Sequence, residues 1–219
     1  MRIYLQLSPN REIVPFNYQA ALVGAFHKWL GPNELHDSMS LYSLSWLTDG
    51  VLDKNGFNFP HGSIFQISAP DENLLQSVIK GILKGTEIRW GMQVEEIRIQ
   101  PTPTFKEEAY FRALSPILIK RELEGQSHQQ FFYPGHPDSN LYLTETLRNK
   151  MRLLDLHFPV NVQFDANYRN PKSKKITYKN IDYKATFCPV IISGHPRAVA
   201  FAWEVGIGNC TGMGFGALR

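Results

Sequence analysis

The chain has 219 residues, 43% hydrophobic and 12% aromatic, which suits one large domain or two small ones around a buried core. A formal charge of +3 permits a nucleic acid partner without requiring one. No apolar run approaches the roughly 20 residues that cross a bilayer, and the N-terminus does not resemble a signal peptide. Cys188 and Cys210 lack C-x-x-C spacing, so we expect free thiols in a cytoplasmic protein without membrane association.

Hydrophobic periodicity in the first half predicts the order strand, helix, strand, strand, helix, strand. We predict strands at 2–7, 41–47 and 63–69, an extended segment at 87–100, and helices at 16–30 and from 70–72 to Gly85. Asn17 is the expected N-cap of the first helix, and Gly31-Pro32 ends it. Lys54-Asn55-Gly56 predicts a hairpin turn. This order is typical of a ferredoxin-like domain.

After a linker at Pro101-Thr102-Pro103 the same order repeats. We predict strands at 110–120, 160–164 and 183–193, helices at 138–158 and 197–205, and a last strand after the terminal glycines. The predicted fold is therefore α+β, with two tandem ferredoxin-like (RRM-like) domains at 1–103 and 104–219. The paired aromatic motifs of the RNA-recognition module are missing from the sequence, so the fold by itself does not identify a function.

The C-terminus is rich in glycine, at Gly206, Gly208, Gly212, Gly214 and Gly216. Glycine reaches positive φ, and successive exposed N–H groups can form a concave anion site. A nucleotide fold would need a helix after such a loop, but only residues 217–219 follow, and no P-loop lysine occurs. The loop therefore predicts a phosphate-bearing partner held by another architecture, and disfavours a mononucleotide-binding domain.

The segment from Glu204 to Gly216 resembles the glycine-rich signature of the CRISPR-associated endoribonucleases that process precursor CRISPR RNA. These enzymes belong to the repeat-associated mysterious protein superfamily. Phe111-Arg-Ala-Leu-Ser-Pro-Ile117 is similar to the stretch that opens the family's second domain, and the segments 22–26, 34–36 and 41–44 are similar to its beginning. The resemblance implies tandem ferredoxin-like domains and metal-independent cleavage of repeat RNA without a cofactor. The ribose 2′-OH would attack the adjacent phosphate, leaving a 2′,3′-cyclic phosphate and a 5′-OH.

This reaction needs a base, an acid and positive charge, and histidine suits both proton roles. By the resemblance, His36 stands where the family places its catalytic histidine, and His27 stands near a tyrosine of some members. The alternative for both is a solvated surface histidine. Some members carry a lysine soon after the catalytic histidine, but 37–40 contains none, so Lys28, Lys54 or the glycine N–H groups are candidates for that role. No spacing suggests zinc or a two-metal carboxylate site.

Several basic residues are expected to hold the RNA, namely Lys28, Lys172, Lys174, Lys175 and Arg197, together with the five glycines. The lysines from 172 to 175 predict a hairpin in an RNA groove or, alternatively, a solvated turn. Arg197 opens the helix before the glycine loop and would contact a phosphate there. Tyr178 and Tyr183 could stack on unpaired bases. Three further cations, Arg148, Lys150 and Arg152, are expected to solvate the outer face of the long helix.

Two functions from different classes follow from the resemblance. The first is a repeat-specific endoribonuclease, with CRISPR repeat RNA as its partner. The alternative is a non-cleaving RNA-binding subunit of a CRISPR effector complex. Cleavage of repeat RNA in EDTA discriminates between them. The sequence leaves open whether the chain forms a homodimer or joins other CRISPR effector subunits.

Overall fold

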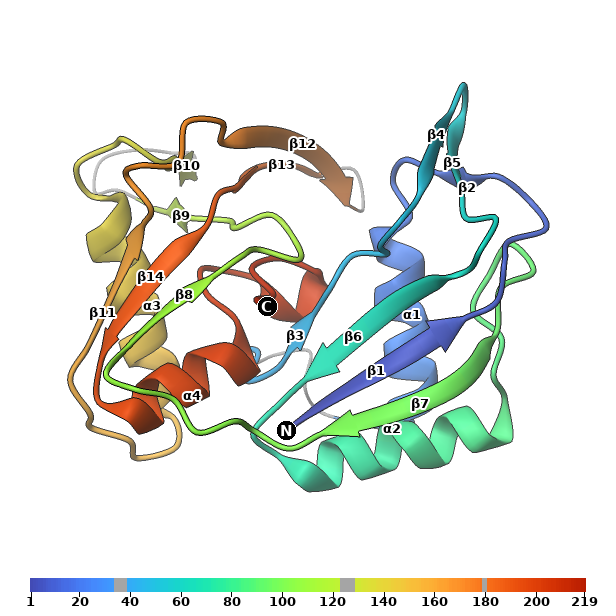
Figure 1. The fold of residues 1–219 in the computed structure, drawn as a ribbon, viewed down its shortest axis with the longest axis horizontal. Helices are drawn as coiled ribbons and strands as arrows, with labels where there is room; N and C mark the ends of the chain where they lie inside the picture. The colour runs from blue at the N-terminus through green and yellow to red at the C-terminus, as the bar shows by residue number, and fades with distance from the viewer. Residues whose placement is uncertain (34–38, 123–128, 179–180) are drawn as a thin grey trace.

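A computed structural model describes residues 1–33, 39–122, 129–178 and 181–219. It contains two halves, each with a sheet and two helices, placed side by side and joined by one extended segment (Figure 1). Both chain termini lie near the junction of the halves. The predicted α+β fold with two ferredoxin-like halves is confirmed.

The first half is built on an antiparallel sheet with the strand order β3-β6-β1-β7. Its strands are β1 (Arg2–Leu7), β3 (Ser43–Leu44), β6 (Ser63–Ser68) and β7 (Val94–Gln100), and its helices are α1 (Gln19–Leu30) and α2 (Glu72–Lys84). A small sheet of β2 (Val14–Pro15), β4 (Val51–Asp53) and β5 (Gly56–Asn58) adds the predicted hairpin. The alternating side chains of Ile3, Leu5 and Leu7 are buried, which makes β1 the centre of this core.

Two predicted elements of the first half are too long. Helix α1 begins at Gln19 with Tyr18 at the N-cap, so Asn17 is not the cap. The chain cannot turn into a helix earlier, because Val14 and Pro15 still pair with β5 and Phe16 packs against Phe57. The strand predicted at 41–47 pairs with β6 only at Ser43–Leu44. By contrast, Asp71 caps α2 as its position predicts, accepting bonds from the N–H groups of residues 73 and 74.

The second half repeats the plan with the strand order β11-β14-β8. Its elements are β8 (Glu108–Phe111), α3 (Ser139–Arg152), β11 (Val160–Phe164), β14 (Val190–Gly194) and α4 (Pro196–Val205). The C-terminal segment takes the place of a fourth strand, since Arg112 and Arg219 exchange backbone bonds of 2.9 Å. The predicted last strand is reduced to a single bridge between Ala113 and Leu218, preceded by a 3₁₀ turn, η2 (Thr211–Met213).

Two ribbons are inserted into this half, and both alter the predicted elements. The short pair is β9 (Lys120–Arg121) with β10 (Gln130–Phe131), and the long pair is β12 (Lys172–Tyr178) with β13 (Ile181–Phe187). The predicted strand 183–193 is therefore two strands, interrupted at Pro189, which has no N–H for a ladder. The long ribbon arches over the molecule, and the end of β12 points toward the first half (Figure 1).

Each half has its own hydrophobic core, and a third cluster joins them. This cluster contains Leu118, Ile176 and Phe215, with Trp46 of the first half packed against it. The predicted domain boundary after residue 103 falls in the extended segment between β7 and β8. The division into 1–103 and 104–219 stays a prediction.

The start of the chain docks onto α4 at one end of the contact between the halves. The Arg2 side chain is 1% exposed and stacks 3.6 Å from the Trp203 ring centre. It donates hydrogen bonds to the Trp203 carbonyl (2.8 Å) and to the Ser68 hydroxyl (3.3 Å). The Met1 ammonium pairs with the Glu204 carboxylate. Burial lowers the pKa of Arg2 to about 10, so its charge persists at neutral pH.

Candidate active site between the two halves

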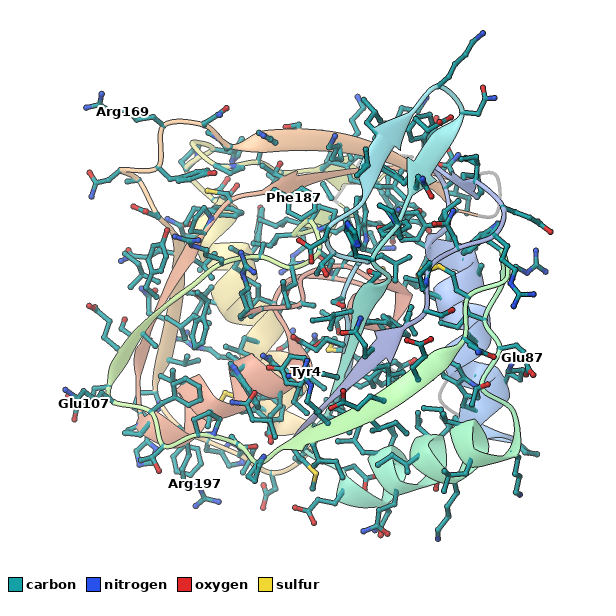
Figure 2. All side chains as sticks on the ribbon, turned by 45° about the vertical axis from the view of Figure 1, so that its right-hand side comes forward. Tyr4, Glu87, Glu107, Arg169, Phe187 and Arg197 are labelled. Atoms are coloured by element: carbon teal, nitrogen blue, oxygen red, sulfur yellow. The ribbon has the colours of Figure 1, made fainter. Side chains whose placement is uncertain are left out.

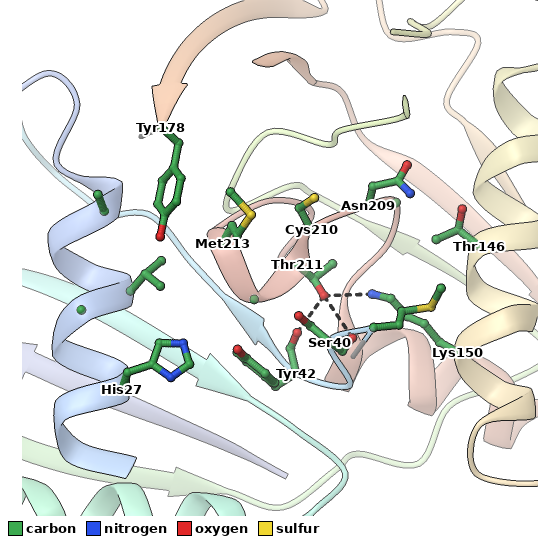
Figure 3. A pocket seen from close by; sticks show the side chains of 16 residues that line it. His27, Ser40, Tyr42, Thr146, Lys150, Tyr178, Asn209, Cys210, Thr211 and Met213 are labelled. Atoms are coloured by element: carbon green, nitrogen blue, oxygen red, sulfur yellow. Dashed lines mark hydrogen bonds between the residues drawn. The ribbon is translucent and has the colours of Figure 1, made fainter. Parts of the chain in front are cut away.

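A pocket of about 540 Å³ opens between the two halves (Figure 3). Helix α1 forms one wall and α3 the opposite one, while the glycine-rich loop, residues 39–42 and the end of β12 close the remaining sides. Its lining residues are Ala20, Val23, Gly24, His27, Met39, Ser40, Tyr42, Thr146, Lys150, Tyr178, Gly208, Asn209, Cys210, Thr211, Gly212 and Met213. A volume of this size holds a nucleotide-sized ligand.

The α1 wall follows from helical spacing. Ala20, Val23, Gly24 and His27 are three or four residues apart, so they share one face, which turns toward the pocket. The His27 imidazole reaches into the pocket from this wall and meets the ring of Phe26 edge-on at 5.1 Å. His27 is half-buried, a setting that suits an acid or base in contact with a ligand.

Gly24 is unusual because a helix interior disfavours glycine by about 1 kcal/mol relative to alanine. A Cβ added at Gly24 would meet nothing within 4 Å, so close packing does not require glycine there. The residue is exposed and lines the pocket. The missing side chain leaves open space in the pocket beside His27.

The glycine-rich loop is closely packed, which the sequence does not predict. A Cβ on Gly216 would lie 1.9 Å from the Ile207 carbonyl oxygen, and one on Gly212 would lie 2.7 Å from the Tyr42 ring. Gly216 also has φ +62°, a conformation that side chains rarely adopt. The glycines at these positions permit close packing of the loop on itself and on the first half.

Many N–H groups of the loop are already used inside the protein. Those that donate to backbone carbonyls belong to Gly206, Ile207, Asn209, Met213, Gly214 and Gly216. These groups cannot cradle a phosphate while they keep their bonds. Phosphate binding by the five glycines stays a prediction, and of them only Gly208 and Gly212 line the pocket.

Lys150 lies opposite His27, and the sequence-based interpretation of it is wrong. It was expected on the outer face of α3, but it is 1% exposed. Leu143, Leu147 and Met151 are also buried, and Lys150 falls on the face that they define. This spacing was the signal that could have found it. The flanking cations Arg148 and Arg152 are exposed, as expected.

A short hydrogen-bond chain connects Lys150 to the first half. The Lys150 ammonium donates to the Thr211 hydroxyl (2.9 Å) and to the Val205 carbonyl (3.2 Å). The Thr211 hydroxyl in turn donates to the Tyr42 carbonyl (2.8 Å), as the dashed lines of Figure 3 show. The chain joins α3, the glycine-rich loop and the segment after residue 39 around one side of the pocket.

The described lining of the pocket carries two basic side chains, His27 and Lys150. Burial lowers the pKa of Lys150 to about 7, and burial raises the pKa of the neighbouring Cys210 thiol. Arg121 donates to the Thr146 hydroxyl at the rim (2.9 Å) and lies 3.7 Å from Glu145. None of the described residues that line the pocket is acidic. Such a site attracts anions.

The structure brings only some of the predicted site residues to the pocket. His27, Gly208 and Gly212 line it, and Tyr178 reaches it from the end of β12 in the long ribbon. His36 lies outside the described residues. Lys28 follows His27 on α1 but contacts the Glu87 carbonyl instead.

The other predicted RNA contacts lie away from the pocket. The three β12 lysines Lys172, Lys174 and Lys175 are exposed along the ribbon, and the last of them pairs with Asp182 at 2.8 Å. The Arg197 guanidinium lies 4.9 Å from the Phe158 ring centre, at the end of α4 remote from the glycine-rich loop (Figure 2). Arg197 thus lies at the start of α4, whereas the glycine-rich loop follows the end of that helix, and its contact with a phosphate stays a prediction. Lys54 is exposed in the β4–β5 hairpin.

Within the described part of the chain, no three His, Cys, Asp or Glu side chains are grouped so that they could hold a metal ion. Among those same residues, no helix has the length and apolar character of a membrane span. Both cysteines are free thiols.

Comparison with known proteins identifies the second half. Residues 100–219, more than half of the chain, match the family described as CRISPR associated protein Cas6, C-terminal. No curated protein matches the chain by sequence.

Three similar solved structures cover the whole chain. The product of a Cas6-related gene from Pyrococcus furiosus has a TM-score of 0.87 at 20% identity over 100% of this chain and 97% of that one. A CRISPR associated protein Cas6 has a TM-score of 0.84 at 21% identity over 100% and 98%. A RAMP protein described as binding different RNA substrates has a TM-score of 0.84 at 19% identity over 100% and 98%. At these identities the likeness shows the fold.

Proposed function

Because the chain belongs to the Cas6 family of CRISPR-associated proteins, we propose that it is an endoribonuclease that cuts precursor CRISPR RNA within its repeats, without a metal ion. The observation that carries the proposal is the position of His27, which faces the buried cation Lys150 across a nucleotide-sized pocket. The pocket combines a proton-transfer group with positive charge, and cleavage of a phosphodiester needs both.

The proposed reaction is an attack of the ribose 2′-oxygen on the adjacent phosphorus. The new P–O2′ bond closes a 2′,3′-cyclic phosphate as the P–O5′ bond breaks. One histidine accepts the 2′-hydroxyl proton, and another donates a proton to the leaving 5′-oxygen. We assign these roles to His27 and His36 as a pair, one neutral and one protonated, without deciding which is the base. Each positioned group contributes roughly 10²–10⁴ in rate.

Tyr178 and Tyr42 supply the remaining surface for a nucleotide. The phenol ring of Tyr178 extends from the end of β12 beside α1, on the side of the pocket away from α3 (Figure 3). An unpaired base that stacks on this ring would gain about 1–3 kcal/mol. Stacking and phosphate contacts hold RNA without reading its sequence. We assign the exposed lysines of the long ribbon to such phosphate contacts, outside the pocket.

The decisive experiment incubates the protein with its cognate repeat RNA in EDTA. We expect one cut within the repeat, with a cyclic phosphate on the 5′ fragment and a free 5′-hydroxyl on the other. A 2′-deoxy substitution at the cut site should abolish cleavage and preserve binding. His27→Ala and His36→Ala should each slow cleavage, while His61→Ala, at an exposed turn, serves as the matched control. Unchanged cleavage by the double variant would refute the assignment.

A second candidate is a protein that binds repeat RNA without cutting it, as a subunit of a CRISPR effector complex. It is favoured by the likeness in fold to the RAMP protein described as binding different RNA substrates. This function predicts tight binding with no product, and indifference to His36→Ala. Size-exclusion chromatography of the RNA-bound protein would separate a monomer from a homodimer or a larger complex.

A further inference from the structure

Lys150 is a buried cation whose charge the protein leaves uncompensated. Its ammonium has three N–H bonds, and the described residues provide acceptors for two of them, the Val205 carbonyl and the Thr211 hydroxyl. No carboxylate pairs with it anywhere in the described residues. Burying an ammonium without a counter-ion is costly, so the site favours the neutral amine until an anion arrives.

None of the described groups around Lys150 is a carboxylate that pairs with its charge. Cys210 stands beside it in the loop and raises its pKa, but burial raises the pKa of that thiol as well and so favours the uncharged form, and Lys120 of β9 lies next to the thiol. Arg121 reaches Thr146, one helical turn before Lys150 on α3, and takes up the charge of Glu145 there. From the first half, the ionisable side chains are His27 of α1 and Tyr42. The missing negative charge has to come from the ligand.

We propose that Lys150 binds the phosphodiester of RNA in this pocket, so that RNA binding is coupled to the uptake of a proton by the Lys150 amine. The ligand class is an RNA backbone phosphate, and naming RNA rests on the proposed function. The proton comes from solvent, and the non-bridging phosphate oxygen accepts a hydrogen bond from the new ammonium. Lys150 thereby supplies the charge for which the sequence offered no lysine after His36.

The loop geometry leaves Lys150 with a free hydrogen-bonding group at the pocket. The N–H groups of the loop glycines Gly206, Gly214 and Gly216 are committed to carbonyl oxygens, whereas Lys150 retains an N–H without an acceptor among the described residues. The pKa of Lys150, about 7, places the change of charge close to neutral pH. A phosphate at hydrogen-bond distance raises the pKa of the amine again, because opposite charges favour the ionised form.

The test measures proton uptake on binding by titration calorimetry, in buffers that differ in ionisation enthalpy. The probe is repeat RNA with a 2′-deoxy substitution at the cut site, which keeps binding separate from cleavage. We expect wild-type protein to take up about one more proton per RNA at pH 8 than Lys150→Met does. Its affinity should fall about tenfold per pH unit above pH 7, whereas that of Lys150→Met should not. Proton uptake by all other groups should be the same in both.

Two further variants complete the design. Lys80→Met removes an exposed lysine of α2 and should keep the proton uptake of the wild type. Lys150→Arg carries a permanent charge and should bind at pH 8 without proton uptake. At pH 6 we expect Lys150→Met to bind at least tenfold more weakly than wild type, the scale of one charge-assisted hydrogen bond.

A ratio of affinities between wild type and Lys150→Met that is equal at pH 6 and pH 8 would overturn the proposal, as would identical proton uptake at pH 8. Either result, with a lowered melting temperature, would make Lys150 a packing residue. A wild-type protein that takes up the proton but never cuts RNA would support the role of Lys150 and refute the proposed cleavage. Absence of any RNA binding would overturn both.

Discussion

Two cations, Arg2 and Lys150, are buried where the halves meet, and both donate to carbonyl oxygens in the last turn of α4, but the protein treats them differently. The Arg2 guanidinium stacks on Trp203, donates to a carbonyl and a hydroxyl, and has Glu204 nearby. Lys150 has a carbonyl and a hydroxyl but no aromatic face and no carboxylate among the described residues. Burial lowers the pKa of both, to about 10 for Arg2 and to about 7 for Lys150.

The difference separates a closed contact from an open one. Arg2 stays charged across the physiological range and fixes β1 against α4. Lys150 changes charge near neutral pH and borders the pocket that His27 enters. A buried charge that is fully paired contributes to the assembly of the halves, while an incompletely paired one is available to a ligand.

The largest expected effect is on the rate of RNA cleavage at the pocket. His27→Ala should slow cleavage of repeat RNA by about 10²–10⁴-fold, because it removes a proton-transfer group. Stability should change little, since His27 is only half-buried. Single-turnover cleavage measures the rate, and thermal unfolding provides the control. A large loss of stability with an unchanged cleavage rate would show that His27 has a structural role and no catalytic one.

The next effect is on the stability of the fold, through the contact of Arg2 with α4. Arg2→Met should lower the free energy of unfolding by about 2–4 kcal/mol, because it leaves the Trp203 carbonyl and Ser68 hydroxyl without their donor. Denaturant unfolding measures the loss. The protein that remains folded should cleave RNA at the wild-type rate. A specific loss of catalysis would contradict the division between the structural contact of Arg2 and the pocket beside Lys150.

A smaller effect distinguishes the two cations by pH. In the unfolded chain Lys150 keeps its proton up to about pH 10.5, whereas in the fold it loses the proton near pH 7. The free energy of unfolding of wild type, relative to Lys150→Met, should therefore rise between these values by up to about 1.4 kcal/mol per pH unit. Below pH 7 both states are protonated and the difference should be constant.

The control for this prediction is the same comparison at Arg2. The pKa of Arg2 stays near 10, so the difference between wild type and Arg2→Met should be constant from pH 6 to pH 9. Denaturant unfolding at several pH values measures both. Parallel stability curves for wild type and Lys150→Met would show that Lys150 keeps its charge in the fold.

The smallest effect concerns the open space at Gly24, on the α1 wall. Gly24→Ala should stabilise α1 by about 0.5–1 kcal/mol, because a Cβ there meets no other atom. Gly24→Leu should also fold, but its side chain would fill the space beside His27 and lower RNA affinity. Thermal unfolding and RNA titration measure the two effects. Full affinity of Gly24→Leu would mean that RNA does not approach this wall.

The element order of both halves could be predicted from the sequence, because buried strands such as 2–7 and 160–164 alternate cleanly. The long ribbon could not, since Lys172-Ser-Lys-Lys175 shows no such alternation and its strand pairs only with β13. This ribbon forms through pairing between residues 172–178 and 181–187, and a local run of polar residues gives no signal of such pairing.

The site was harder to predict than the fold. His27 was found because a resemblance pointed to it, but Lys150 was overlooked because lysine is rarely fully buried, although its spacing from Leu147 and Met151 places it inside. The glycines were interpreted as an anion loop on the assumption that their N–H groups are free. The N–H of Gly216 donates to the Pro116 carbonyl and its carbonyl accepts from the Ile207 N–H, contacts that exist only after the chain has folded back on itself.

One hydroxyl, that of Thr211, serves both halves at once. It accepts from the Lys150 ammonium and donates to the Tyr42 carbonyl. When the halves part at this point, the Tyr42 carbonyl loses its donor, whereas Lys150 keeps Thr211, because both of these residues belong to the second half. The contact between the halves thus fixes the direction of the Thr211 O–H bond, and with it the lone pair that this hydroxyl offers to the amine.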